Sequence, residues 1–328
     1  ALIDLVSQKG QLPPLKANVR LDGKTALVTG ANSGLGKAVA IDLAKRGARV
    51  LMVCRSGIPD AGEEVKRLSG STRVDMLKVD LADLNSVSRL CDQLRNSGVV
   101  LDIAVMNAGL MPLQARRSAQ GHEIMFAVHF LANRLMLVRW LKDGVIRPRI
   151  GKGEPPRVIF VSSEAHQSSA PIDFDHFGAF VDYGMKDGMK HYGMSKLHLS
   201  TFVAELSRRI NGAENDATSS AAVISSAAVK VAVHSLCPGP IASNIARESP
   251  TWIKPILGPI MKAFFRSPEK AAEPVILLAA APEFGKRTGV YLHMMREKLP
   301  SSLTLDADNG ALLWQKSEAM LTDFLPKE

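Results

Sequence analysis

The sequence has few aromatic residues, and its positive charges do not form runs. Aromatic side chains make up 5% of the 328 residues, and the Lys and Arg residues are scattered although the net charge is +9. Nucleic-acid recognition uses clustered basic residues together with stacking aromatic rings, so we expect no nucleic-acid partner. The charge is instead compatible with a phosphate-bearing ligand or with contact to an acidic membrane surface.

Cysteine is also scarce. Cys54, Cys91 and Cys237 are an odd number without paired spacing, so we expect small apolar side chains in a reducing compartment, and no metal site. The first residues, ALIDLVSQKG, have neither a basic start nor a long apolar run. They predict no signal peptide or anchor, and a cytoplasmic or membrane-peripheral location.

What is present is a glycine-rich turn between a strand pattern and a helix pattern. Residues 24–36 are KTALVTGANSGLG, in which a short apolar run precedes Gly30, Gly34 and Gly36. Glycines at such a turn let a phosphate approach backbone N–H groups at the positive end of the helix. The spacing, Gly-x3-Gly-x-Gly, predicts a dinucleotide site; a simple tight turn is the alternative.

Strand and helix patterns alternate along the rest of the chain. Buried strands are predicted at 26–28, 49–54, 74–79, 101–106, 157–161, 230–236 and 289–292, and helices at 36–46, 60–69, 84–94, 121–141, 192–210 and 268–281. This order predicts an α/β fold with a doubly wound parallel sheet, a Rossmann fold, whose ligand crevice lies at the carboxyl ends of the strands. We expect a single domain over 23–328, preceded by a surface arm over 1–22.

Tyr192 and Lys196 lie four residues apart on a predicted helix and therefore share one face. A nearby ammonium favours the ionised phenol, which would suit Tyr192 for proton exchange with an alcohol or a carbonyl. A surface Tyr and Lys is the alternative. Tyr183 has Asp187 at the fourth position and is not expected to act in this way.

Three other candidates follow predicted strands. Ser163 is placed to hydrogen-bond a substrate oxygen or to cap the next segment. Asp80 is placed to accept a hydrogen bond from an adenine amine or to cap a helix. Arg55 stands where an acidic residue would bind an unmodified ribose, so a cation there, with Lys37 nearby, favours a 2′-phosphate. An exposed Arg is the alternative.

Together these residues resemble the short-chain dehydrogenase/reductase family. The matching segments occur in the family's order: TGANSGLG at 29–36, Asp80, NAG at 107–109, SS at 162–163, YGMSK at 192–196 and PGPIAS at 238–243. The segments CRS at 54–56, SSEAH at 162–166 and ALLWQKSEAML at 311–321 are most similar to the retinol dehydrogenase and carbonyl reductase branch.

The resemblance implies catalytic roles for Ser163, Tyr192 and Lys196 and a nicotinamide cofactor, for which Arg55 favours NADP(H). The cofactor contacts that it implies are Gly30, Asn32, Ser33, Gly34, Leu35, Gly36, Arg55, Asp80, Leu81, Asn107, Ala108, Gly109, Tyr192, Lys196, Pro238, Gly239, Ile241 and Ser243.

One position departs from the family's pattern. The family's segment FQVNHLGHF has an Asn that anchors a proton-relaying water, whereas the matching segment here, FAVHFLANR at 126–134, has His129 at that position. Either His129 takes a catalytic role by holding the water differently, or it is a buried histidine with satisfied hydrogen bonds. Asn133, one helical turn away, is a second candidate.

We therefore expect hydride transfer between NADP(H) and a carbonyl or an alcohol. An apolar segment near 244–268 predicts a substrate lid and a lipophilic substrate, such as a retinoid, a steroid or a long-chain aldehyde or ketone. Packing on the sheet or a partner subunit, or contact with a membrane surface, is the alternative for this segment. The other functions considered are a double-bond reductase similar to protochlorophyllide reductases and a non-enzymatic NADPH sensor. The resemblance also suggests a homodimer through the helices at 121–141 and 192–210.

Overall fold

The core of the fold is an eight-stranded sheet in which every pair but one is parallel. The computed structural model describes residues 10–149, 151, 153–212, 224–225, 229–241 and 266–325. The strands lie in the order β10-β9-β7-β5-β4-β1-β2-β3, and only β9 and β10 pair antiparallel. Their bounds are β1 Thr25–Thr29, β2 Arg49–Cys54, β3 Val74–Lys78, β4 Ile103–Met106, β5 Arg157–Val161, β7 Ala232–Cys237, β9 Tyr291–His293 and β10 Arg296–Glu297. Two short strands, β6 (Ile224–Ser225) and β8 (Arg287–Thr288), form a separate antiparallel pair.

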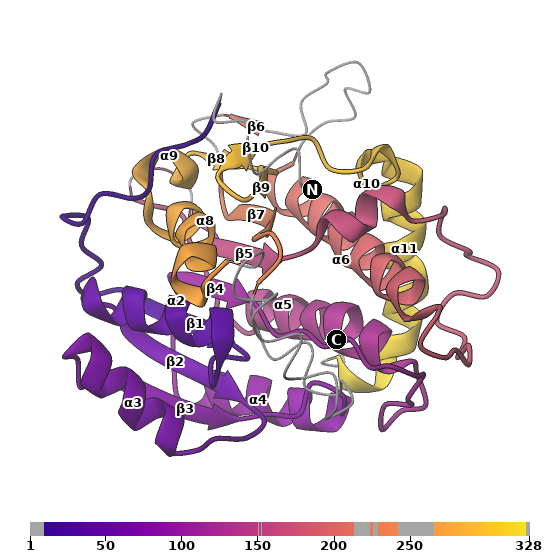
Figure 1. Ribbon diagram of the computed structural model, residues 1–328, viewed down its shortest axis with the longest axis horizontal. Coiled ribbons are helices and arrows are strands. Elements are labelled where there is room, and N and C mark those ends of the chain that lie inside the picture. The colour runs from indigo at the N-terminus through magenta and orange to yellow at the C-terminus, as the bar shows by residue number, and fades with distance from the viewer. Residues whose placement is uncertain are drawn as a thin grey trace.

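Helices cover both faces of this sheet, as Figure 1 shows. One face carries α2 (Gly34–Lys45), α3 (Asp60–Ser69) and α8 (Pro268–Ala280), and the other carries α4 (Leu84–Asn96), α5 (Ala132–Lys142) and α6 (Gly188–Asn211). The remaining helical segments are η1 Phe126–Leu131, η2 Glu164–Ser168, α9 Pro282–Gly285, α10 Ser302–Leu305, α11 Ala307–Leu321 and η4 Thr322–Phe324. The predicted doubly wound α/β fold and its single domain are confirmed.

The central strands are mainly apolar because the sheet is buried on both sides. In β1, Leu27 packs into the core beneath α4, α5 and α6, whereas its neighbours Ala26 and Val28 pack into the core beneath α2, α3 and α8. Since successive side chains of a strand point to opposite faces, one short run fills two cores. This is why uninterrupted apolar runs located the strands well.

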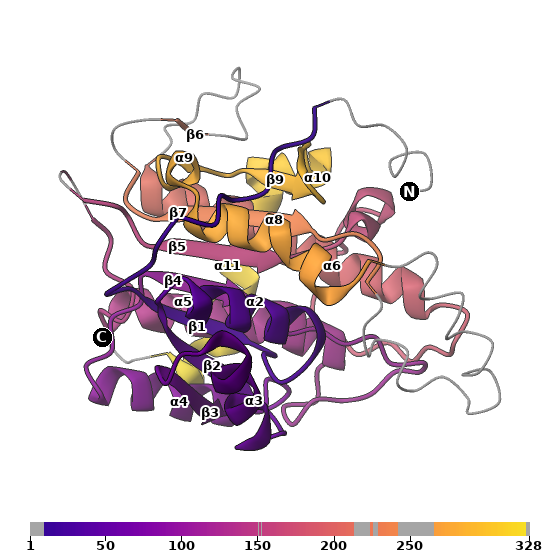
Figure 2. The same ribbon diagram turned by 60° about the vertical axis from the view of Figure 1, so that its left-hand side comes forward.

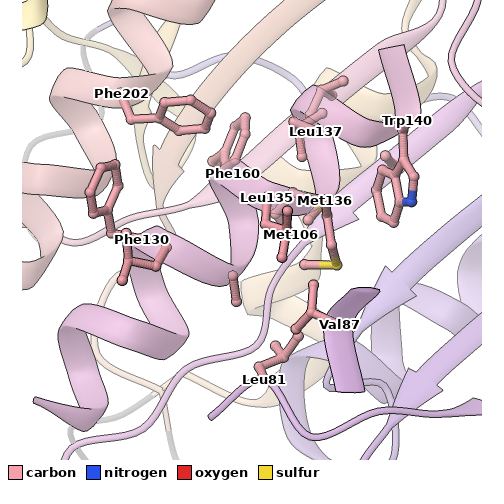
Figure 3. Packing of buried hydrophobic residues seen from close by; sticks show 14 of the residues in the cluster. Leu81, Val87, Met106, Phe130, Leu135, Met136, Leu137, Trp140, Phe160 and Phe202 are labelled. Atoms are coloured by element: carbon pink, nitrogen blue, oxygen red, sulfur yellow. The ribbon is translucent and has the colours of Figure 1, made fainter. Parts of the chain in front are cut away.

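The core on the α5 and α6 face is rich in aromatic rings, several of which Figure 3 labels. Phe202 of α6 packs against Phe160 of β5 and Phe130 of η1, with ring centroids 6.0 and 5.9 Å apart. The C-terminal helix α11 packs on the outside of α6, and Phe202 stacks there on Trp314. The helix that contains Tyr192 and Lys196 is therefore held from two sides.

Two helix boundaries differ from the predictions. Helix α6 begins at Gly188, so Tyr192 lies in its second turn, and the predicted helix over 121–141 is divided into a π-helical segment, η1, and α5. The carboxylate of Glu123 accepts the Phe126 N–H where η1 begins, which sets the start of this helix later than the apolar pattern indicates.

Residues 10–22 pack against the face that carries α8, where Figure 2 shows them as an indigo trace. The Leu12 N–H donates to the Met295 carbonyl, and Leu12, Leu15 and Val19 are partly buried against the core. Among the helices that the structure describes, none combines the length and the apolar character needed to cross a membrane.

The packing of Phe202 predicts a large stability effect. Phe202→Ala removes a fully buried ring and should lower the free energy of unfolding by about 3–5 kcal/mol, because the aromatic neighbours cannot close the cavity. Denaturant titration followed by circular dichroism measures this loss. Leu299→Ala, at a side chain that is 59% exposed, should change stability by less than about 0.5 kcal/mol. Equal effects of the two substitutions would contradict the packing described.

Candidate functional site

The ends of β1 and β4 are held together by one buried threonine. The Thr29 hydroxyl accepts hydrogen bonds from the N–H groups of Asn107 (2.9 Å) and Ala108 (3.0 Å). The Asn107 amide donates in return to the Thr29 carbonyl at 2.9 Å. Connections leave β1 and β4 toward opposite faces of the sheet, so this is the point where an open α/β sheet has its ligand crevice.

The glycine turn lies directly beside this junction. Gly30 and Gly34 have φ angles of +65° and +54°, in the region that favours glycine. A Cβ on Gly36 would overlap the Gly30 carbonyl oxygen and the Asn107 amide. The residue before α2, Ser33, makes no side-chain hydrogen bond to the helix end. A close-packed turn with a helix N-terminus open to a ligand fits a dinucleotide phosphate.

Arg55 follows β2 at the same edge of the sheet. Its side chain is exposed and makes no hydrogen bond or ion pair with any described residue. Asn32 of the glycine turn approaches Gly57, so the two loops are in contact. Lys37, which was expected to add charge here, forms an ion pair with Glu64 at 2.8 Å. Arg55 is therefore the cation of this loop that has no carboxylate partner among the described residues.

Asp80 follows β3 and does not cap the next helix. One of its carboxylate oxygens accepts the Ala82 N–H at 3.0 Å, whereas the cap of α4 is Asp83, which accepts the Asn85 N–H. Leu81 beside it is buried. Of the two interpretations of Asp80, the helix cap is wrong, because the chain makes a further turn before α4 begins.

Ser163 follows β5, and its backbone is braced by a histidine that the sequence analysis did not single out. His166 Nδ1 lies 2.6 Å from the Ser163 carbonyl, while His166 Nε2 accepts the Ser301 N–H at 3.2 Å. The Ser163 hydroxyl accepts the Ala165 N–H at 3.2 Å and lies close enough to the Tyr192 hydroxyl to affect its pKa. The segment SSEAH thus positions its serine through its own histidine.

Tyr192 and Lys196 lie on one face of α6, and that face points to the ends of the strands. Lys196 Nζ donates to the Val161 carbonyl at the end of β5 (3.0 Å) and lies 5.6 Å from the centroid of the Tyr192 ring. Burial lowers the pKa of Lys196 to about 8. The phenol, the ammonium and the Ser163 hydroxyl are therefore brought together.

The expected lowering of the Tyr192 pKa does not occur in this structure. Burial raises the pKa of Tyr192 to about 12, although the nearby Ser163 hydroxyl acts in the opposite direction. The physical reason is desolvation: in this pocket the loss of water costs the phenolate more than the neighbouring polar groups return.

His129 is fully buried, and both of its ring nitrogens are engaged. Nε2 accepts the Leu110 N–H (3.0 Å), so Nδ1 carries the proton and donates to Ser195 Oγ (2.9 Å), which donates to the Tyr192 carbonyl (2.7 Å). Burial, together with the Lys196 charge, holds the pKa of His129 well below its usual range. This neutral histidine matches the interpretation of a satisfied buried side chain that contacts the site.

Asn133 also has a structural partner: its amide donates to the His129 carbonyl at 2.7 Å. Tyr183, which was not expected to act as a catalytic residue, donates its hydroxyl to Glu123 at 2.8 Å. Burial and this carboxylate raise the Tyr183 pKa above its ordinary value.

The turn after β7 closes the other end of the site. A Cβ on Gly239, which has a φ of +83°, would contact the Met294 side chain, and Ile241 pairs with Arg266 in an isolated bridge. The Arg266 guanidinium donates to the Pro238 carbonyl at 3.3 Å. Ser243 and most of the predicted lid near 244–268 lie outside the described residues.

Comparisons with known proteins agree with this geometry. The model of the family described as short chain dehydrogenase matches residues 24–173. Human retinol dehydrogenase 14 is 30% identical over 92% of this chain and 87% of its own length, and human retinol dehydrogenase 13 is 31% identical over 94% and 87%. The solved RhlG/NADP active-site complex from Pseudomonas aeruginosa has the same fold, with a TM-score of 0.61 and 22% identity over 89% of this chain and all of that one.

The close packing at Gly36 predicts that a single methyl group disturbs the glycine turn. Gly36→Ala should weaken NADPH binding about tenfold or more, because the turn and the start of α2 must move apart. Quenching or enhancement of NADPH fluorescence on titration gives the dissociation constant. Gly188→Ala is the matched control, since its Cβ would come no closer than 3.6 Å to the Pro112 carbonyl. Unchanged binding by Gly36→Ala would show that the dinucleotide does not use this turn.

Proposed function

From membership of the short-chain dehydrogenase/reductase family, to which this chain belongs, we propose that this oxidoreductase transfers a hydride between NADP(H) and a lipophilic alcohol or carbonyl. The observation that supports it most is the meeting of Ser163, Tyr192 and Lys196 at the carboxyl edge of the sheet, across from the glycine turn. When bound, the nicotinamide supplies or accepts the hydride.

Tyr192 donates the proton to the substrate oxygen. Its hydroxyl lies near that of Ser163, so a substrate oxygen that approaches both groups can accept one hydrogen bond from each. A neutral phenol is the form that donates, and a pKa of about 12 keeps Tyr192 in that form at neutral pH. Carbonyl reduction is therefore the direction for which the described residues are protonated.

Lys196 acts beside the phenol rather than on the substrate. With a pKa of about 8, its ammonium is charged at neutral pH, where it stabilises negative charge that develops on the Tyr192 oxygen. Its hydrogen bond to the Val161 carbonyl fixes the side chain in this place. Lys196 thus supplies the positive charge that offsets the negative charge on the Tyr192 oxygen as its proton leaves.

The choice of NADP(H) over NAD(H) is supported by Arg55. A guanidinium that has no carboxylate partner among the described residues, in a loop that contacts the glycine turn through Gly57 and Asn32, suits a 2′-phosphate. The ion pair of Lys37 with Glu64 leaves this recognition mainly to Arg55.

The described residues offer the substrate an open hollow of about 560 Å³ between the chain after β4 and the chain before α6. Leu113, Gln114 and Arg116 line it from the first of these segments, and Gly184 and Met185 line it from the second. Met185 is 67% exposed there, and Met189, in the first turn of α6, is 60% exposed. Flexible methionine side chains suit apolar ligands of variable shape. A homodimer and membrane contact stay predictions; α11 already covers one side of α6 within the chain.

The assignment of Tyr192 predicts a specific loss. Tyr192→Phe should reduce carbonyl reduction by about 100-fold or more while NADPH binding persists, because only the proton donor is removed. Consumption of NADPH with retinal, ketosteroids and long-chain aldehydes measures turnover. Tyr183→Phe removes the other hydroxyl of this region and should keep most of the activity. Near-normal turnover by Tyr192→Phe would refute the assignment.

The assignment of Arg55 predicts a change in cofactor preference. Arg55→Gln should lower the ratio of kcat/KM with NADPH to that with NADH by about 10- to 100-fold, the value of one or two charged hydrogen bonds. Arg67→Gln removes the same charge from an exposed position on α3 and should leave the ratio unchanged. An equal ratio for the two variants would contradict a 2′-phosphate site at Arg55.

A further inference from the structure

Cys237 stands apart from the other two cysteines because it lies beside an imidazole and a carboxylate. It is the last residue of β7, and its register partner on the parallel strand β9 is His293. Cross-strand partners in a parallel pair project from the same face of the sheet, so the thiol and the imidazole are neighbours. Cys237 is 6% exposed, whereas Cys54 and Cys91 are 1% and 0% exposed.

The imidazole is in turn next to Glu164, the residue after Ser163. His293 Nδ1 lies 3.3 Å from Glu164 Oε1, at ion-pair distance rather than in a well-aligned hydrogen bond. Glu164 is itself fixed by the Tyr291 hydroxyl (2.6 Å) and by the Lys298 ammonium. Three segments far apart in the sequence thus bring a thiol, an imidazole and a carboxylate together.

The charges of this cluster place an imidazolium beside the Cys237 sulfur. The Cys237 thiol and, to a smaller extent, the Glu164 carboxylate raise the pKa of His293 to about 9, so its ring is protonated at neutral pH. Burial opposes ionisation of Glu164, but the neighbouring His293 and the hydrogen bonds from Lys298 and Tyr291 outweigh it and hold the pKa of Glu164 below its usual range. An imidazolium kept in place by a carboxylate is the partner that activates cysteines.

The cluster also borders the catalytic residues. Cys237 is close enough to Tyr192 and Lys196 to act on the pKa of both side chains, and it directly precedes the Pro238–Gly239 turn. Burial raises the pKa of the Cys54 thiol to about 11. Burial is also the main cause of the higher pKa of Cys91, about 12. These two thiols are therefore poor nucleophiles at neutral pH.

We propose that Cys237, His293 and Glu164 form a covalent modification site at which α,β-unsaturated aldehydes add to the thiol. As the sulfur forms a bond with the β-carbon of the enal, the His293 imidazolium gives a proton to the α-carbon and takes up the Cys237 proton in its place. The addition needs no oxidant or further reactant. The choice of an enal as the electrophile rests on the proposed function, in which the substrate is a lipophilic carbonyl. The reactivity of the Cys237 thiol does not depend on that proposal.

The test uses the full chain and two probes, iodoacetamide and trans-2-nonenal, each added at low molar excess at neutral pH. Peptide mass spectrometry over time gives the rate of modification at each of the three cysteines. Cys237 should react with both probes about tenfold faster than Cys54 and Cys91 or more, since a neighbouring imidazolium stabilises the negative charge that a reacting sulfur carries. Equal rates at the three cysteines, or no nonenal adduct at Cys237, would overturn the proposal.

Variants distinguish activation from mere access. His293→Asn should slow the reaction at Cys237 about tenfold or more, and Glu164→Gln should slow it by a smaller factor. His176→Asn removes an exposed histidine that is also paired with a carboxylate, Asp173, and should change nothing. If His293→Asn unfolds the chain, the same mass spectra will show it, because Cys54 and Cys91 then become reactive. In that case the rate at Cys237 in Glu164→Gln tests the proposal instead. An unchanged Cys237 rate in folded His293→Asn would refute the role of the imidazole.

Discussion

The hydroxyl of Thr29 is the contact on which the geometry of the site depends. It accepts two backbone N–H groups from the end of β4, while the Asn107 amide returns a bond to the end of β1. Thr29 is fully buried, so water cannot replace it, and each unpaired buried N–H would cost about 1–3 kcal/mol. Because Gly36 packs against both Gly30 and Asn107, the position of α2 follows from the same junction.

Burial stabilises the hydrogen bonds of Thr29, but it destabilises the charged forms of the catalytic side chains. Lys196 is buried with the Val161 carbonyl as its acceptor, and its pKa falls to about 8 as that of Tyr192 rises to about 12. A fold that only optimised stability would not hold an ammonium and a phenol in this place. The surrounding aromatic core and the chain Leu110–His129–Ser195 keep α6 in position despite that cost.

The sequence predicted the strands and the Tyr192–Lys196 pair because those features are local. A strand buried on both sides is an apolar run, and a spacing of four on a helix places two side chains on one face. The start of α4 at Leu84 was predicted correctly, but the residue that caps it was not, since Asp80 and Asp83 are equally good caps by type and only the extra turn after β3 selects Asp83. The Tyr192 pKa was misjudged because the sequence shows the neighbouring charge but not the desolvation. The Cys237–His293–Glu164 cluster was missed because it arises from the register of β7 with β9 and from the position of β5 beside β7.

The central claim is that one edge of the sheet holds a dinucleotide between the glycine turn and the Tyr192–Lys196 face of α6. A crystal structure of the chain soaked with NADP+ tests it most directly. We expect the pyrophosphate at Gly30, Gly34 and Gly36, the 2′-phosphate at Arg55, and the nicotinamide within reach of Tyr192 and Lys196. A dinucleotide bound with its nicotinamide away from these two side chains, or density for it elsewhere on the molecule, would contradict the account.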